Sequence, residues 1–142
     1  MIFKSKKDNL FTITILGLNT FLIGITIYGF ITGELEKDEY WTLIPILGVV
    51  VLLFWMFFGT NYQLSKNELI YRCGPIKGKI KINRITEIIK GKTLWVGLKP
   101  ATSRKGLIIK YDKYNEIYIS PNTNESFIAE LLKLKSDIKI ND

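Results

Sequence analysis

The side chains most able to do chemistry in this 142-residue chain are cations. Beyond Thr60 the chain holds 16 Lys and Arg residues against 8 Asp and Glu residues. Cations beside a tryptophan can bind the phosphate groups of an anionic lipid surface, with about 1 kcal/mol per well-placed charge. The alternative is that they are the ordinary solvated faces of strands. The residues that we predict to form a lipid- or partner-binding face are Lys79, Lys81, Arg84, Lys90, Lys92, Trp95, Lys99, Arg104 and Lys105.

Other kinds of chemistry lack the residues they need. The chain has no histidine, which removes Ser-His and Cys-His pairs and the most common zinc ligand. Its single cysteine, Cys73, cannot form an intramolecular disulfide and is expected in the core as a small hydrophobe. Ser103 and Lys105 are close in sequence, but closeness in sequence does not give the geometry of a nucleophile and its base. We therefore expect no catalytic residues, no cofactor, no metal and no enzyme, and the absence of a recognised motif argues against nucleic acid.

Two apolar segments must position the cationic part of the chain. Leu10–Thr32 and Thr42–Gly59 contain no charged side chain. As helices they would be about 34 Å and about 27 Å long, against about 30 Å for the hydrocarbon core of a bilayer. The short connection Gly33–Trp41 makes the two helices antiparallel. We predict a membrane anchor over residues 1–60, with transmembrane helices at about 10–32 and 42–59.

The charges that flank these segments predict their orientation. Residues 1–9 carry a net charge of +2, residues 33–41 carry −3, and the chain from Thr60 onward carries +8. Basic flanks stay on the cytoplasmic side, so both termini are expected in the cytoplasm and residues 33–41 outside. The first apolar run is too long for a signal-peptide core and no A-x-A cleavage site is available.

Asn19 is a candidate intramembrane contact. Its amide lies near the middle of the first apolar segment and needs a hydrogen-bond partner there. The pattern favours a hydrogen bond between the two helices, and the alternative is contact with a ligand or a membrane partner. Gly17, Thr20 and Gly24 form a stripe of small residues that would allow close approach to the second helix at Gly48.

From residue 61 onward the pattern changes to short alternating segments typical of strands. The longer connection Lys92–Thr102 is a candidate partner-binding loop, or alternatively a segment whose Trp95 and Leu98 close the end of a barrel. Asn122 and Glu125 have capping-box spacing, and the apolar residues that follow them have helical spacing. The sequence therefore predicts an α+β fold, with a bent antiparallel sheet or open barrel and one C-terminal helix over residues 61–142. The predicted strands are Tyr62–Leu64, Glu68–Cys73, Lys77–Ile82, Ile85–Ile89, Gly106–Tyr111 and Glu116–Ser120.

Motifs in this part of the chain resemble those of the bacterial pleckstrin-homology-like (PH-like) domains. Tyr62-x-Leu64, Leu69–Gly74 and Lys79–Ile82 resemble the start of such a domain. The similarity is greatest over Lys92–Leu132, where the motifs that appear in order are Thr93-Leu94-Trp95-x-Gly97-Leu98-Lys99-Pro100-Ala101, Gly106-Leu107-Ile108-Ile109-Lys110-Tyr111, Ile117-Tyr118-Ile119-Ser120-Pro121 and Phe127-Ile128. The subfamily includes the immunity protein that protects producers of the bacteriocin sublancin, together with membrane-anchored relatives. The resemblance covers about residues 61–134 and implies a PH-like barrel of bent antiparallel sheet capped by a helix, with no catalytic residues.

The resemblance implies an interaction module in the cell membrane of a Gram-positive bacterium. Its expected role is bacteriocin self-immunity, by binding the toxin or by shielding the toxin's target. The alternative is a structural or scaffolding membrane protein whose basic domain binds anionic lipid or a protein partner, or forms a homo-oligomer, without an immunity role. The many Ile, Lys and Asn residues also indicate an AT-rich bacterial genome.

Overall fold

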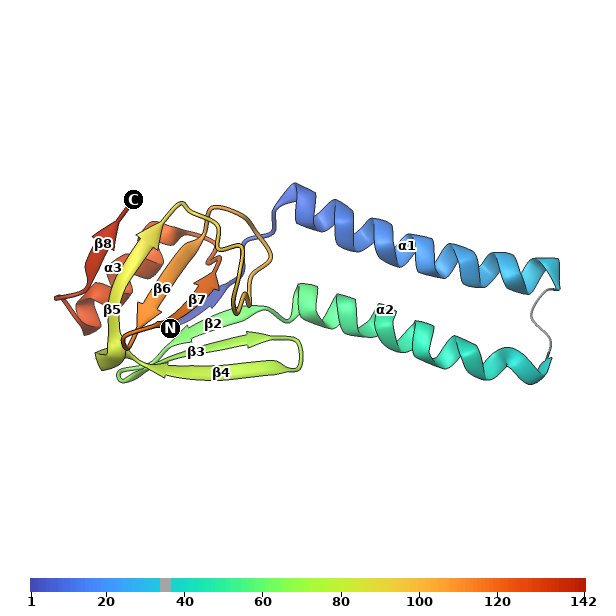
Figure 1. Cartoon of the computed structure of the whole chain (residues 1–142), viewed down its shortest axis with the longest axis horizontal. Coiled ribbons are helices and arrows are strands. Elements are labelled where there is room, and N and C mark those ends of the chain that lie inside the picture. The colour runs from blue at the N-terminus through green and yellow to red at the C-terminus, as the bar shows by residue number, and fades with distance from the viewer. Residues whose placement is uncertain (34–36) are drawn as a thin grey trace.

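The computed structural model describes residues 1–33 and 37–142, with a β domain at one end and two long helices extending from it (Figure 1). Helix α1 (Asn9–Thr32) and helix α2 (Leu43–Phe58) lie antiparallel, and the 3-10 helix η1 (Lys37–Thr42) precedes α2. The predicted helix boundaries agree with these to within one residue. Part of the predicted connection, residues 34–36, lies outside the described residues.

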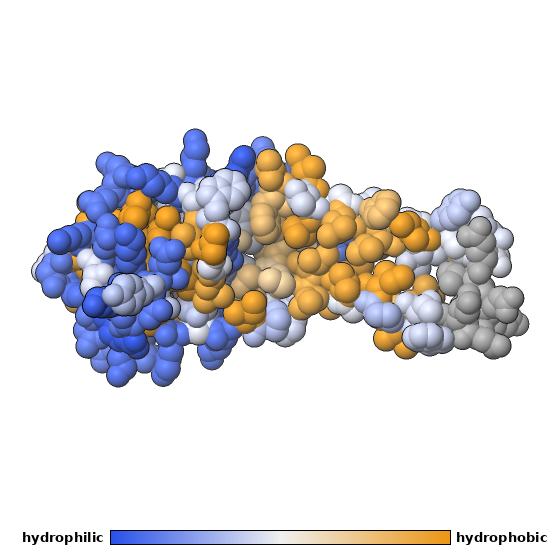
Figure 2. All heavy atoms as spheres, viewed as in Figure 1, coloured by the Kyte–Doolittle hydropathy of each residue, from blue (hydrophilic) through white to orange (hydrophobic). Residues whose placement is uncertain are grey.

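The two helices are apolar on nearly every side. Helix α1 is capped by Asp8, whose carboxylate accepts the N–H of Leu10 at 3.0 Å, and it ends at Gly33 in the left-handed conformation that glycine adopts readily. Most of the large side chains of α1 and α2 are exposed, including Ile31 at 78% and Ile44 at 71%. Figure 2 shows a mostly hydrophobic surface over the helices and a mostly hydrophilic one over the β domain. By length and composition both helices could cross a membrane, and they are not covered as core helices would be.

The first sheet of the β domain has the strand order β1-β2-β3-β4 and is antiparallel throughout. Its strands are β1 (Ile2–Lys4), β2 (Asn61–Leu64), β3 (Glu68–Cys73) and β4 (Ile76–Lys81). The alternation predicted for β4 is confirmed, because Lys79 and Lys81 are exposed while Ile80 and Ile82 are buried.

The second sheet has the order β7-β6-β5-β8. Its strands are β5 (Ile85–Lys90), β6 (Leu107–Tyr111), β7 (Asn115–Ile119) and β8 (Lys139–Asn141). A short 3-10 helix, η2 (Ile82–Arg84), connects the two sheets, and β8 is a parallel edge strand against β5. The sheets share one core, which the C-terminal helix α3 (Asn124–Leu134) completes with Phe127, Ile128 and Leu131.

This architecture confirms the predicted α+β class with a PH-like sheet and a C-terminal helix. All six predicted strands are present, but the predicted capping box is wrong. Thr123, not Asn122, occupies the N-cap of α3, and its side chain makes no capping hydrogen bond. Strand β1 was not predicted; it is a strand of the β domain formed by residues that precede the first helix. Phe3 of β1 packs edge-on against Phe127, with 5.1 Å between the ring centroids.

A buried group of hydroxyls joins this N-terminal strand to the rest of the domain. The hydroxyl of Tyr62 donates to the Pro100 carbonyl at 2.5 Å, accepts the N–H of Ser120 at 3.1 Å and lies 3.0 Å from the Ser5 hydroxyl. The Thr102 hydroxyl lies 2.9 Å from that of Ser5. Burial raises the pKa of Tyr62, so this side chain stays neutral and can keep donating.

We predict that Tyr62→Phe lowers the free energy of unfolding by about 1–3 kcal/mol, because it leaves buried hydrogen-bonding groups without a partner. Thermal unfolding of the full chain in detergent, followed by circular dichroism, measures the effect. Tyr114→Phe is the matched control, because Tyr114 is 84% exposed. Equal stability of the two variants would show that the hydroxyl does not hold these segments together.

Candidate functional site

The segment between β5 and β6, residues 91–106, lies beside the ends of the helices that join the β domain (Figure 1). We call this segment the β5–β6 loop, and we call the first turn of α1 and the last turn of α2 the hairpin base. The second half of the loop is fixed to β7, since the N–H of Tyr118 donates to the Leu98 carbonyl at 3.0 Å. The hydroxyl of Tyr118 accepts the N–H of Gly106 and donates to the Ser103 carbonyl, each at 2.8 Å. Tyr118 is therefore buried, because the loop covers it.

The tip of the loop is apolar and exposed. Trp95 is 82% and Val96 is 80% exposed. The ammonium group of Lys99 donates to the Trp95 carbonyl, which places a cation directly beside the tip. Trp95 thus does not close the end of the barrel, and the alternative interpretation of this loop is wrong for that residue.

An apolar cavity of about 260 Å³ separates the loop from the hairpin base. Helices α1 and α2 line one side of it and the loop lines the other. Its apolar wall includes Phe11, Ile15, Leu53, Met56, Phe57, Leu94, Trp95 and Ala101.

A cationic hollow adjoins this cavity. Lys6, Lys7, Arg104 and Lys105 line it together with one carboxylate, that of Asp8. This space is the cationic hollow, and its apolar neighbour is the apolar cavity. Thr93, Ser103 and Arg104 line both, so the two lie next to each other.

Aromatic rings and a carboxylate hold two of these cations in place. The ammonium nitrogen of Lys7 lies 4.5 Å from the ring centroid of Phe57 and 4.0 Å from that of Phe58. Asp8 Oδ2 accepts from Arg104 Nε at 2.8 Å. This hydrogen bond lowers the pKa of Asp8 below its usual value and raises the pKa of Arg104.

The nine residues predicted as one binding face lie in different places. Lys92, Trp95, Lys99, Arg104 and Lys105 belong to the β5–β6 loop beside the hairpin base.

The other four are distributed over the strands and their ends. Lys90 ends β5 and pairs with Glu125 at 3.7 Å, and Lys79 lies on edge strand β4 and pairs with Glu68 at 3.3 Å. Arg84, in η2, makes a bidentate ion pair with Asp112. Lys81 lines a separate hollow at the end of the β domain that is remote from α1 and α2 (Figure 1).

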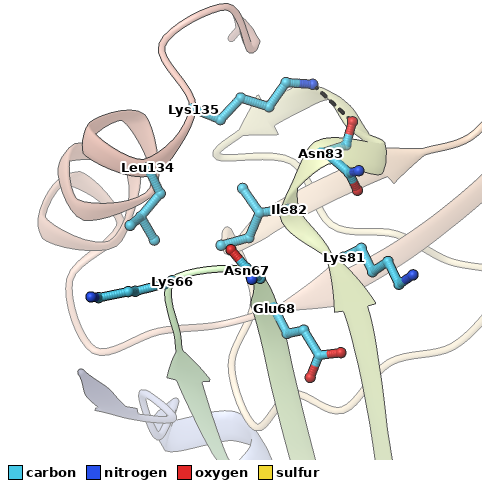
Figure 3. A pocket seen from close by; sticks show the side chains of 8 residues that line it. All are labelled: Lys66, Asn67, Glu68, Lys81, Ile82, Asn83, Leu134 and Lys135. Atoms are coloured by element: carbon cyan, nitrogen blue, oxygen red, sulfur yellow. Dashed lines mark hydrogen bonds between the residues drawn. The ribbon is translucent and has the colours of Figure 1, made fainter.

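Figure 3 shows this remote hollow between α3 and the end of β4. Lys66, Lys81 and Lys135 line it together with Glu68. The ammonium group of Lys135 already donates to the carbonyls of Asn83 at 3.2 Å and Ile85 at 2.7 Å. The remote hollow thus has three cations and one carboxylate, against four cations and one carboxylate in the cationic hollow.

Sequence reasoning missed Lys6, Lys7 and Asp8 as site residues. Their charges served only to orient the helices, although β1 brings them to the loop. The sequence held a usable signal, since three lysines and an N-cap aspartate stand directly before α1.

Asn19 does not make the predicted hydrogen bond to the second helix. Its side chain is 1% exposed, and its amide nitrogen donates to the Ile15 carbonyl of its own helix at 2.8 Å. Among the described residues its amide oxygen has no hydrogen-bond partner. The predicted close approach at Gly17, Gly24 and Gly48 is also wrong, because a Cβ on any of them would have no described neighbour within 4 Å.

The fold and the site define a PH-like domain joined to a pair of apolar helices. Residues 60–135, more than half of the chain, match the family model of the bacterial PH domain. The chain therefore belongs to the bacterial PH domain family, whose domains are generally non-catalytic modules that bind lipids or proteins. Searches of curated proteins and of solved structures gave no significant match. Over residues 1–33 and 37–142, no group of three or more His, Cys, Asp or Glu side chains could hold a metal ion.

We predict that the Asp8–Arg104 pair stabilises the protein near neutral pH and stops doing so in acid. Because the pKa of Asp8 is lowered in the folded state, the stabilisation is present above the ordinary pKa of about 3.9 and is lost as pH falls through the lowered value. The test compares the thermal unfolding of the parent chain with that of Asp8→Asn, which keeps a capping side chain, from pH 7 to pH 3. The difference in melting temperature should shrink toward zero in acid. A difference that is independent of pH would contradict the prediction.

Proposed function

We propose that this protein is a binding module held on the cytoplasmic face of a bacterial cell membrane by α1 and α2 as transmembrane helices. Residues 1–60 serve as the anchor and residues 61–142 as the PH-like domain. Strand β1 belongs to the anchor segment by its position in the sequence, but it pairs with β2 in the first sheet of the domain. The observation that carries the proposal is that two exposed apolar helices emerge from the basic β domain beside the cationic hollow. Basic flanks favour the cytoplasmic side, which places both termini there.

The partner that this arrangement suits is the anionic inner leaflet. The loop tip, with Trp95 and Val96, lies beside the point where the helices would enter the bilayer. Tryptophan is favoured at membrane interfaces, and lysines near an anionic surface are attracted to it. Lys92, Lys99, Arg104 and Lys105 would face that surface. Lys79, Lys81, Arg84 and Lys90 would remain for a partner in the cytoplasm.

Labelling of single cysteines in intact cells tests the topology. In a Cys73→Ala background, Lys37→Cys should react with a membrane-impermeant maleimide from outside. Asp142→Cys should react only after lysis, because the domain is inside. Labelling of both sites in intact cells, or of neither before lysis, would contradict the proposed membrane arrangement.

A role in bacteriocin self-immunity is the more specific candidate. It is supported by the ordered motifs over Lys92–Leu132, which resemble those of the subfamily that includes the sublancin immunity protein. The exposed tip of the β5–β6 loop lies within that stretch and is available to bind the toxin or to shield its target. The alternative candidate is a scaffold that binds a host membrane protein or another copy of itself, with no toxin involved.

Expression of the full chain in a sensitive Gram-positive strain, followed by challenge with the bacteriocin, tests the immunity role. Immunity predicts a rise in the inhibitory concentration that is lost in a Trp95→Ser variant of equal abundance, with Tyr114→Ser as a control at another exposed aromatic. Unchanged sensitivity would overturn immunity. The scaffold role would then predict a host partner in crosslinked membranes that contain no toxin.

A further inference from the structure

We propose that the junction between the hairpin base and the β5–β6 loop binds one anionic phospholipid molecule. Its phosphate would lie in the cationic hollow and one acyl chain would lie in the apolar cavity. This inference rests on the proposed membrane location and goes beyond it, because it names a defined lipid site in place of general attraction to the leaflet.

The closeness of the two spaces is the first argument. A site that is apolar on one side and cationic on the other matches a molecule with a hydrocarbon chain joined to a phosphate. Thr93, Ser103 and Arg104 line both spaces, so the two lie next to each other at the same part of the loop. The apolar cavity is bounded partly by side chains of both helices, and it is therefore at the depth where acyl chains begin.

The charge of the hollow is the second argument. Four cationic side chains face one carboxylate there, which favours an anionic over a zwitterionic headgroup. The carboxylate of Asp8 accepts a hydrogen bond from Nε of Arg104. Within the described part of the chain, no hydrogen bond engages the two terminal guanidinium nitrogens of Arg104. Those nitrogens can donate to two oxygens of one phosphate. Lys7 is held over Phe57 at the border between hollow and cavity, where a headgroup would meet its chain.

The backbone of Lys105 is the third argument. Its φ of 55° is left-handed, a conformation that costs a lysine more than a glycine. The Thr93 hydroxyl accepts the N–H of Lys105 at 3.2 Å, and the Asn124 amide donates to its carbonyl at 3.0 Å. The loop therefore holds a cation at the edge of the hollow in a position where glycine would be easier.

Native mass spectrometry of the full chain, released from detergent micelles with equal amounts of dioleoyl phosphatidylglycerol and dioleoyl phosphatidylcholine, tests the site. One phosphatidylglycerol per chain should be retained in preference to phosphatidylcholine. Lys7→Gln and Lys105→Gln should each weaken that binding about fivefold, as expected for one lost charge near a phosphate. Lys77→Gln and Lys139→Gln remove exposed lysines from β4 and β8 and should have no effect.

Two further arms distinguish the sources of the phosphate and the contribution of the backbone. Glycerophosphoglycerol, which has the headgroup without acyl chains, should not displace the lipid. Displacement at equal concentration would assign the hollow to a soluble phosphate and overturn the lipid site. Lys105→Gly should lose affinity like Lys105→Gln while its melting temperature stays equal or rises, which separates binding from folding.

Equal retention of the two lipids, or equal losses in the control variants, would overturn the inference. Cysteine labelling tests the membrane arrangement separately. A chain that labels as predicted but retains no phosphatidylglycerol would therefore contradict only the proposed lipid site. A chain that fails the labelling test would contradict the proposed function itself.

Discussion

The arrangement of this protein depends on the buried hydroxyl of Tyr62. It joins Ser5, the Pro100 carbonyl and the Ser120 backbone, three segments that lie far apart in the sequence. Ser5 is followed within a few residues by α1, Tyr62 follows α2, and Pro100 belongs to the β5–β6 loop. One polar contact in the core therefore brings both ends of the helical pair and the loop to the same corner of the β domain. The hydrogen bond between Asp8 and Arg104 adds a second connection between the start of α1 and the loop.

Local periodicity explains which parts of the fold could be predicted. Long uncharged runs define α1 and α2, and strands such as β4 alternate cleanly because one face meets the core. Strand β1 could not be found in this way. Three residues, Ile2–Lys4, show no period, and their pairing with Asn61–Gln63 crosses the whole helical pair. Alternation would also not predict that Tyr118 is buried, since a loop folds over the second face of β7 and removes the water that alternation assumes.

The candidate site could be predicted only in part, because closeness in sequence is a poor guide to closeness in a bent sheet. Lys79 and Lys81 were grouped with Arg104 and Lys105 by their positions along the chain, yet Lys81 lines the remote hollow while Arg104 and Lys105 line the cationic hollow. The cationic hollow instead combines Arg104 with Asp8, which are 96 positions apart in the sequence. That combination depends on β1, and local periodicity in the sequence does not predict β1. What the sequence did supply was the composition of the loop, with Trp95 among cations.

The physical advantage of such a junction lies in tethering. If α1 and α2 span the membrane as proposed, the β5–β6 loop is held at the leaflet surface at a high effective concentration, so contacts that would be weak for a free domain become sufficient. The rigid attachment of the second half of the loop to β7 lowers the entropy that is lost when its tip meets the membrane. The opposite end of the β domain, where Lys81 and Arg84 lie, then points away from the bilayer. A domain fixed in this orientation can bind lipid at one end and still present its other surfaces to a partner in the cytoplasm.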